Sequence, residues 1–146
     1  MVLRAELVRE RLVRLEEVVS RLEELSRLEP QRVRQDFRDA WAVERGLQLA
    51  AEILFDTGNH ILSAQYGRSA QDYEDIVVQL GEAGVLTPAT RERLKGLGGF
   101  RNVLVHGYLR LDPQRVWEYL QDAPARFSEF GRDVRQWLAR LSAAPP

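Results

Sequence analysis

Apolar residues recur every three or four positions along almost the whole chain, and this spacing constrains the fold more than any other feature. The first stripe comprises Val8, Leu12, Leu15, Val19 and Leu22. Such spacing places apolar side chains on one face of a helix, and no segment shows the alternation typical of a strand. The sequence therefore predicts an all-α fold: an antiparallel bundle of about five helices, two of them long.

Prolines and capping residues predict where these helices begin. Pro30 follows Glu29 and suits the first position of a second helix, whose apolar stripe continues without a proline to about residue 62. Ser69-Ala-Gln-Asp72 resembles a capping box. Thr87-Pro88 and Asp112-Pro113 each predict a helix start, with the polar residue as the cap.

Glycines and a proline mark bends and ends. Gly96, Gly98 and Gly99 lie within the predicted helix after Pro88 and indicate close backbone packing or a bend just before Arg101. Gly107 is expected to end that helix. Pro124 is expected to kink or split the last one. We expect a single domain over residues 1–146, with a frayed tail at about 142–146.

Composition excludes several classes of protein. The 146 residues contain no cysteine, which excludes a disulfide framework, a thiolate zinc site and a cysteine nucleophile. The 22 acidic and 21 basic residues give a net charge of −1, so any contact with nucleic acid must be local. No apolar run reaches the length of a membrane span, and no signal peptide is apparent. We expect a cytoplasmic protein with no membrane partner.

One stretch concentrates side chains that can do chemistry. Residues 100–108 read Phe-Arg-Asn-Val-Leu-Val-His-Gly-Tyr and place Arg101, Asn102, His106 and Tyr108 at the end of a glycine-rich helix. Asn102 and His106 are four residues apart and share a helix face. Arg101 lies about 140° around the helix from His106, but its long side chain is expected to curl toward the same edge. Tyr108 follows Gly107 and is expected to turn back from the helix.

Histidine and arginine together suit the cleavage of a phosphodiester. A histidine side chain can accept or donate a proton near neutral pH, and a guanidinium matches the oxygens of a phosphate. In RNA the 2′-hydroxyl can attack the adjacent phosphate without a metal, a cofactor or a protein nucleophile. That reaction needs both an acid and a base, while each chain supplies one such histidine. A twofold homodimer that joins two copies of this segment would supply both.

Structural roles are the alternative for the same residues. His106 could be a helix C-terminal residue stabilised by the helix dipole, Arg101 a surface ion-pair residue, and Tyr108 a packing residue. His60 is the other histidine, but a metal site with His106 would need a third ligand that nothing in the sequence marks. Glu44 and Asp36 could line a dimer cleft, although the polar part of an interface is favoured. Three tryptophans are expected to pack in the core or in an interface: Trp41, Trp117 and Trp137.

The segment also resembles a known family. Arg101-Asn102-x3-His106-x-Tyr108 is similar to the Arg-x4-His-x-Tyr motif of HEPN-domain proteins, specifically their HepT-like toxins. The surrounding segments 36–52, 56–61, 73–80 and 97–106 resemble the family as well, so the similarity covers roughly residues 5–140.

The resemblance implies a metal-independent endoribonuclease that acts as a homodimer, in a type II-like or type VII-like toxin–antitoxin system. It implies catalysis by Arg101 and His106, with Asn102 orienting the pair. The implied partner is a minimal nucleotidyltransferase antitoxin that transfers AMP from ATP to Tyr108. Two alternatives stay open: a non-catalytic subunit that holds nucleotide or substrate for that nucleotidyltransferase, and a plain helical interaction protein.

Overall fold

The computed structural model describes residues 2–145, and within that range the chain is helical with no strand. The helices are α1 (Ala5–Ser26), α2 (Pro30–Gln35), α3 (Phe37–Tyr66), α4 (Tyr73–Glu82), α5 (Pro88–Arg93), α6 (Leu97–His106) and α7 (Pro113–Ala143). The predicted all-α bundle is confirmed. Three of its helices are long, whereas the sequence predicted two. The helix predicted from Pro30 is divided into α2 and α3, and the helix predicted from Pro88 is divided into α5 and α6.

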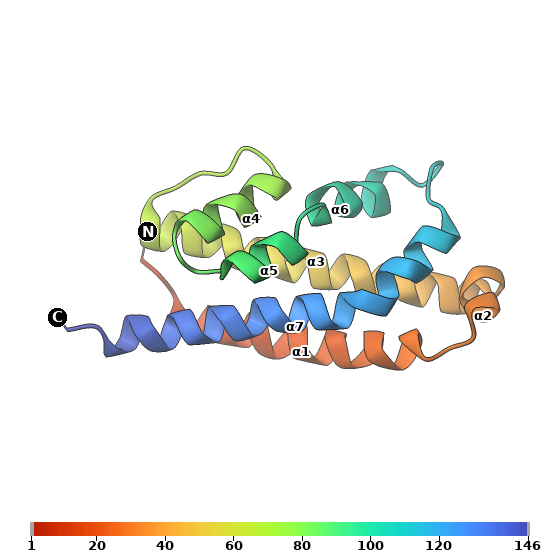
Figure 1. Ribbon diagram of the computed structural model, residues 1–146, viewed down its shortest axis with the longest axis horizontal. Helices are drawn as coiled ribbons and strands as arrows, with labels where there is room; N and C mark the ends of the chain where they lie inside the picture. The colour runs from red at the N-terminus through yellow and green to blue at the C-terminus, as the bar shows by residue number, and fades with distance from the viewer. Residues whose placement is uncertain (1, 146) are drawn as a thin grey trace.

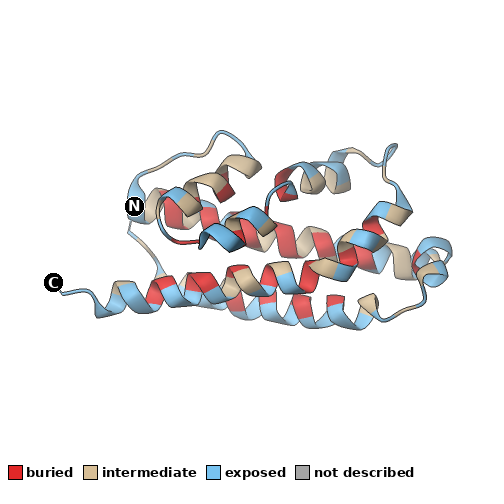
Figure 2. Ribbon diagram, in the orientation of Figure 1, coloured by how far each residue is buried: buried red, intermediate tan, exposed pale blue. Residues whose placement is uncertain are grey.

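The long helices α1, α3 and α7 form the body of the bundle (Figure 1). Helix α1 runs antiparallel to both α3 and α7, and the described ends of the chain lie at the same end of the bundle. The short helices α4 and α6 pack on the side of α3 that faces away from α1, and α5 packs between α4 and α7. Figure 2 shows the buried residues gathered along the inner faces of the long helices, among them Leu12, Leu22, Leu54, Phe127 and Phe130.

The predicted second helix is interrupted at Asp36. This residue is extended (φ −88°, ψ 113°), and its carboxylate accepts a hydrogen bond from the Arg38 backbone N–H at 2.9 Å. An acidic side chain that accepts a hydrogen bond from the backbone N–H two residues later is a helix N-cap. Helix α3 therefore starts anew at Phe37. The prediction of one unbroken helix was therefore wrong at this point.

Three further boundaries can be compared with the sequence. Thr87 caps α5 and Asp112 caps α7, as predicted. Asp72, not Ser69, caps α4: its side chain accepts from the Asp75 backbone N–H at 2.8 Å. Pro124 is buried within α7 and does not split it, since the residues around it pack into the core. Helix α7 continues to Ala143, and Pro146 of the predicted frayed tail lies outside the described residues.

Candidate functional site

Helix α6 is held in place at its first turn by Glu74 of α4. The Glu74 carboxylate accepts hydrogen bonds from the backbone N–H groups of Gly96, at 3.1 Å, and Gly98. Gly96 has a φ of 91°, which favours glycine and divides α5 from α6. A Cβ on Gly98 would lie 2.6 Å from the Glu74 backbone nitrogen, so only glycine permits this approach. The glycines thus provide both the close packing and the bend that the sequence predicted.

Arg101 is fixed on the inner side of α6. Its Nε donates a hydrogen bond to Glu52 Oε1 of α3 at 2.7 Å, and its guanidinium carbon lies 4.4 Å from the centre of the Tyr73 ring of α4. Only 13% of the Arg101 side chain is exposed. The alternative of a surface ion-pair residue is therefore wrong. Sequence reasoning missed Glu52 and Tyr73 as partners because they lie 49 and 28 positions away.

Asn102 and His106 occupy the outer side of α6, and both are exposed. Asn102 Oδ1 accepts a hydrogen bond from Arg101 Nη1 at 3.3 Å. Within residues 2–145, the His106 side chain makes no hydrogen bond or ion pair. Glu52 and the Tyr73 ring hold the Arg101 guanidinium against α3 and α4. That the Arg101 side chain reaches toward His106 stays a prediction. One chain therefore brings Arg101 and Asn102 into direct contact.

Tyr108 leaves the helix as the sequence predicted. Gly107 ends α6, and its N–H bonds to the Val103 carbonyl at 2.9 Å. Tyr108 follows with 75% of its surface exposed. It lines a hollow of about 170 Å³ together with Glu44 of α3. Burial raises the pKa of the Glu44 carboxyl above its ordinary value. Tyr108 is thus largely exposed to solvent at this end of the bundle.

The remaining candidates have structural partners. Asp36 is the cap of α3, a role that the sequence did not assign to it. The Nε2 atom of His60 accepts a hydrogen bond from the Arg4 backbone N–H at 3.1 Å, so this nitrogen is not free for a metal. Burial, reinforced by the charges of Arg11 and Arg4, lowers the pKa of His60. No cluster of three or more potential metal ligands occurs in the described part of the chain.

The tryptophans differ in burial. Trp137 lies in the core and is 4% exposed, whereas 65% of Trp41 is exposed. Trp41 and Phe37 form an edge-to-face pair on α3 with ring centres 5.1 Å apart. Trp41 precedes Glu52 by eleven residues, or about three turns, so the exposed Trp41 and the partner of Arg101 share one face of α3. This exposure excludes core packing for Trp41, and its interface role stays a prediction.

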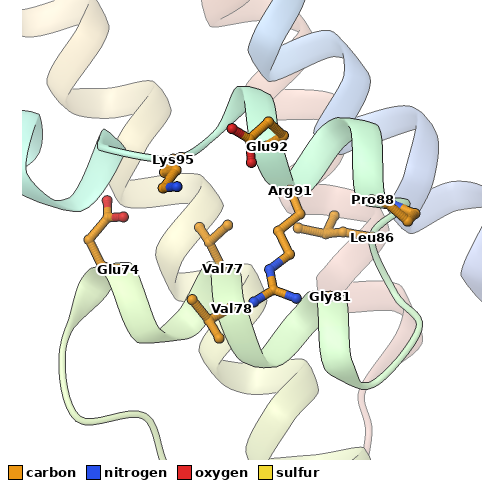
Figure 3. A pocket seen from close by; sticks show the side chains of 9 residues that line it. All are labelled: Glu74, Val77, Val78, Gly81, Leu86, Pro88, Arg91, Glu92 and Lys95. Carbon is orange, nitrogen blue, oxygen red and sulfur yellow. The ribbon is translucent and has the colours of Figure 1, made fainter.

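A separate hollow between α4 and α5 has balanced charges. Figure 3 shows Glu74 and Glu92 facing it along with Arg91 and Lys95, above the apolar side chains of α4. The Arg91 side chain extends over Gly81, where a Cβ would lie 2.5 Å from Arg91 Cδ. None of the motif residues lines this hollow. It therefore does not belong to the candidate site.

Solved structures that share this arrangement of helices include a cytosolic protein and a HEPN toxin. The cytosolic protein YutE of Bacillus subtilis has a TM-score of 0.83 at 23% identity, and the match covers 100% of this chain and 99% of that one. The HEPN toxin of Shewanella oneidensis, solved tri-AMPylated and in complex with an MNT antitoxin, has a TM-score of 0.78 at 23% identity over 88% of this chain and 96% of that one. This chain has the HEPN fold.

Sequence comparison identifies the family. The model of the family described as Ribonuclease HepT-like matches residues 15–134. The tRNA nuclease HepT of Aphanizomenon flos-aquae is 31% identical over 106 residues, which are 72% of this chain and 71% of that protein. The mRNA nuclease HepT of Shewanella oneidensis is 30% identical over 97 residues, 66% of this chain and 73% of that protein. The chain belongs to the HepT-like ribonuclease family.

Family membership confirms the resemblance drawn from the Arg101–Tyr108 motif and the predicted class of activity, a ribonuclease. No helix among the described residues is long and apolar enough to cross a membrane.

Proposed function

We propose that this chain is the endoribonuclease toxin of a toxin–antitoxin pair and that Arg101 and His106 cleave RNA without a metal ion. The observation that carries the proposal is the placement of Arg101. Glu52 and Asn102 occupy Nε and Nη1, while Nη2 has no hydrogen-bond partner within residues 2–145. A guanidinium fixed on one edge can bind a phosphate oxygen with little loss of conformational entropy.

The reaction needs one proton acceptor and one proton donor. A neutral His106 takes the proton from the 2′-hydroxyl, and the 2′-oxygen forms a bond to the adjacent phosphorus. The bond from that phosphorus to the 5′-oxygen breaks, and a protonated histidine donates a proton to this leaving oxygen. The products carry a 2′,3′-cyclic phosphate and a 5′-hydroxyl. Arg101 stabilises the negative charge that builds on the phosphate oxygens.

The second histidine comes from a second copy of the chain. The motif of each chain holds one histidine, so a site that uses one histidine as acid and another as base is completed by a homodimer. Large apolar side chains are exposed around this end of the bundle: Phe37, Trp41, Val103, Tyr108 and Leu109. Burying such side chains against an identical face favours a twofold dimer that places the two motifs at one cleft.

Glu52 is a positioning residue in this account. Its carboxylate holds Arg101 Nε, and the Tyr73 ring stacks on the same guanidinium, which fixes its plane. Glu52 contacts no substrate itself. Its role is to present the remaining edge of Arg101 in one orientation.

Tyr108 is the site of regulation. A cognate minimal nucleotidyltransferase in the cytoplasm transfers AMP to it: the Tyr108 oxygen bonds to the α-phosphorus of ATP, pyrophosphate leaves, and the hydroxyl proton passes to solvent. The structure of a related HEPN toxin that is AMPylated and bound to an MNT antitoxin supports this proposal. The added phosphate competes with RNA for Arg101, and the adenosine blocks the cleft.

The test is cleavage of a labelled RNA by the purified wild type and by Arg101→Ala and His106→Ala. Loss of His106 is expected to reduce the rate by at least about 100-fold, the contribution typical of proton transfer. Loss of Arg101 is expected to reduce it by about 100-fold or more, the contribution typical of a group that stabilises charge in the transition state. Unchanged helical circular dichroism controls for folding. A wild type that binds RNA but does not cleave it would instead favour a non-catalytic binding subunit.

A further inference from the structure

A second hollow lies on the outer side of α6, between that helix, the loop at 107–112 and the first turns of α7. Its volume is about 640 Å³, within the usual range for sites that hold a small molecule or a nucleotide. Gly99 opens one wall, because a Cβ at this position would have no atom within 4 Å. The hollow adjoins the one that Tyr108 lines, with which it shares Leu111 and Val116.

Three cationic side chains line this hollow: Lys95, Arg110 and Arg115. Within residues 2–145 none of the three makes a side-chain hydrogen bond or ion pair, whereas most arginines elsewhere have acidic partners. The acidic residue in the lining is Asp112, and its Oδ1 already accepts a hydrogen bond from the Gln114 N–H at 3.0 Å. Figure 3 shows Lys95 at the junction of α5 and α6, near Glu74. The chain has a net charge of −1, so this hollow is a local excess of positive charge.

The floor of the hollow is apolar and aromatic. The rings of Phe100 and Tyr119 stack with centres 4.0 Å apart and planes 14° from parallel. Burial raises the pKa of the Tyr119 hydroxyl to about 12, so the phenol stays neutral. Val103 and Val116 complete this surface. An apolar floor under a cationic rim matches a nucleotide, whose base and sugar are less polar than its phosphate.

The hollow adjoins the proposed catalytic histidine. Gly99, Val103 and His106 follow one another at intervals of four and three residues, so they form one row along α6. Val103 and His106 are therefore neighbours on the helix surface. Arg110 follows His106 by four residues. The row along α6 therefore leads from the hollow to His106.

We propose that this hollow is a subsite for one nucleotide of the RNA strand next to the cleaved bond. Arg110 and Arg115 bind its phosphate, with Lys95 at the far rim, and the Phe100–Tyr119 floor supports the sugar and base. The proposal rests on the proposed function, since it takes RNA as the substrate. It accounts for how a chain with a net negative charge binds a polyanion.

The experiment measures binding separately from cleavage. In a His106→Ala background, the affinity for a fluorescein-labelled single-stranded RNA 12-mer is measured by anisotropy between 0.05 and about 0.3 M salt. The test variant carries Arg110→Gln and Arg115→Gln. The control carries Arg4→Gln and Arg27→Gln, two exposed arginines with no side-chain partner within residues 2–145 and far from α6 in the chain.

Each phosphate contact contributes about 0.7 to the slope of log affinity against log salt concentration. The test variant loses two contacts, so this slope should fall by about 1.4 and the affinity at 0.1 M salt by about 25-fold. The control should change affinity less than about 2-fold. Equal affinity of the test and control variants would overturn the subsite, and so would a test variant that binds RNA normally but no longer binds its nucleotidyltransferase. Cleavage by the wild type is assayed independently, so a failed subsite and a failed ribonuclease proposal are distinguishable.

Discussion

Arg101 and Glu52 are 49 residues apart in the chain and are joined by a hydrogen-bonded ion pair of 2.7 Å. The pair links α6, which carries the motif, to the middle of α3. It leaves 13% of the Arg101 side chain and 31% of the Glu52 side chain exposed. The Arg101 side chain is therefore mostly buried, and the ion pair restricts its rotamers.

Replacing Glu52 with glutamine tests this link. The amide still accepts a hydrogen bond but no longer attracts the guanidinium by charge, so Arg101 is held less firmly. We expect kcat for RNA cleavage to fall by about 10-fold while KM changes little, because a misplaced group costs more in the transition state than in binding. The control is Glu16→Gln, which removes an exposed pair with Arg135. Glu52 would have only a structural role if Glu52→Gln lowered thermal stability and the control variant lost as much kcat as Glu52→Gln did.

The exposed aromatic pair on α3 predicts an interface. We expect the wild type to sediment as a dimer at micromolar concentration and Trp41→Glu to sediment as a monomer with reduced cleavage, because the new charge would be buried without a partner. Val13→Glu places the same charge on another exposed apolar residue, on α1, and should leave the dimer intact. A monomeric wild type, or a Trp41→Glu protein that stays dimeric, would contradict the composite site.

Tyr108 is expected to be the residue that the antitoxin modifies. Co-expression with the cognate nucleotidyltransferase should add AMP to the wild type and abolish cleavage while the fold and the dimer persist. Tyr108→Phe should stay folded, gain no mass and remain toxic, whereas Tyr66→Phe should be modified like the wild type. Intact-mass analysis measures the outcome. AMP found on the Tyr108→Phe protein, or its neutralisation by the antitoxin, would show that the switch lies elsewhere.

Stability should depend on pH through Asp133. Burial alone would raise the pKa of this carboxyl, but hydrogen bonds from Thr90, Thr87 and Arg132 more than offset it and lower the pKa below its ordinary value of 3.8. A depressed folded-state pKa stabilises the protein above about pH 4, and this stabilisation is lost as the pH falls through the folded-state value.

We therefore expect Asp133→Asn to lower the free energy of unfolding at pH 7 by about 1–3 kcal/mol, the cost of disturbing a buried hydrogen-bond network. At pH 3 the difference from the wild type should shrink. Urea denaturation at the two pH values measures it. An equal difference at both would mean that the Asp133 charge does not contribute.

The sequence predicted the features that depend on neighbouring residues. Thr87 and Asp112 cap the helices that follow them, and Gly107 ends α6, because each effect is decided within about four positions. The interruption at Asp36 was missed, since the apolar stripe continues across it and no proline marks it. Periodicity reports which face is buried, not whether the backbone is continuous.

Contacts between distant segments could not be predicted in this way. The motif identified Arg101, but its partners Glu52 and Tyr73 are on other helices, and nothing local marks them. The cationic hollow likewise combines Lys95 with Arg110 and Arg115 only after the loop at 107–112 brings α7 beside α6. A net charge of −1 conceals such a cluster, because it averages over the whole surface.

The central claim is that Arg101 and His106 direct the 2′-hydroxyl of RNA against its own phosphate without a metal. The most direct measurement is the cleavage of a defined RNA by unmodified protein in excess EDTA, with mass spectrometry of the product ends. We predict undiminished cleavage and fragments that end in 2′,3′-cyclic phosphate and begin with a 5′-hydroxyl. Cleavage that stops on chelation, or fragments that end in a 3′-hydroxyl, would contradict the account.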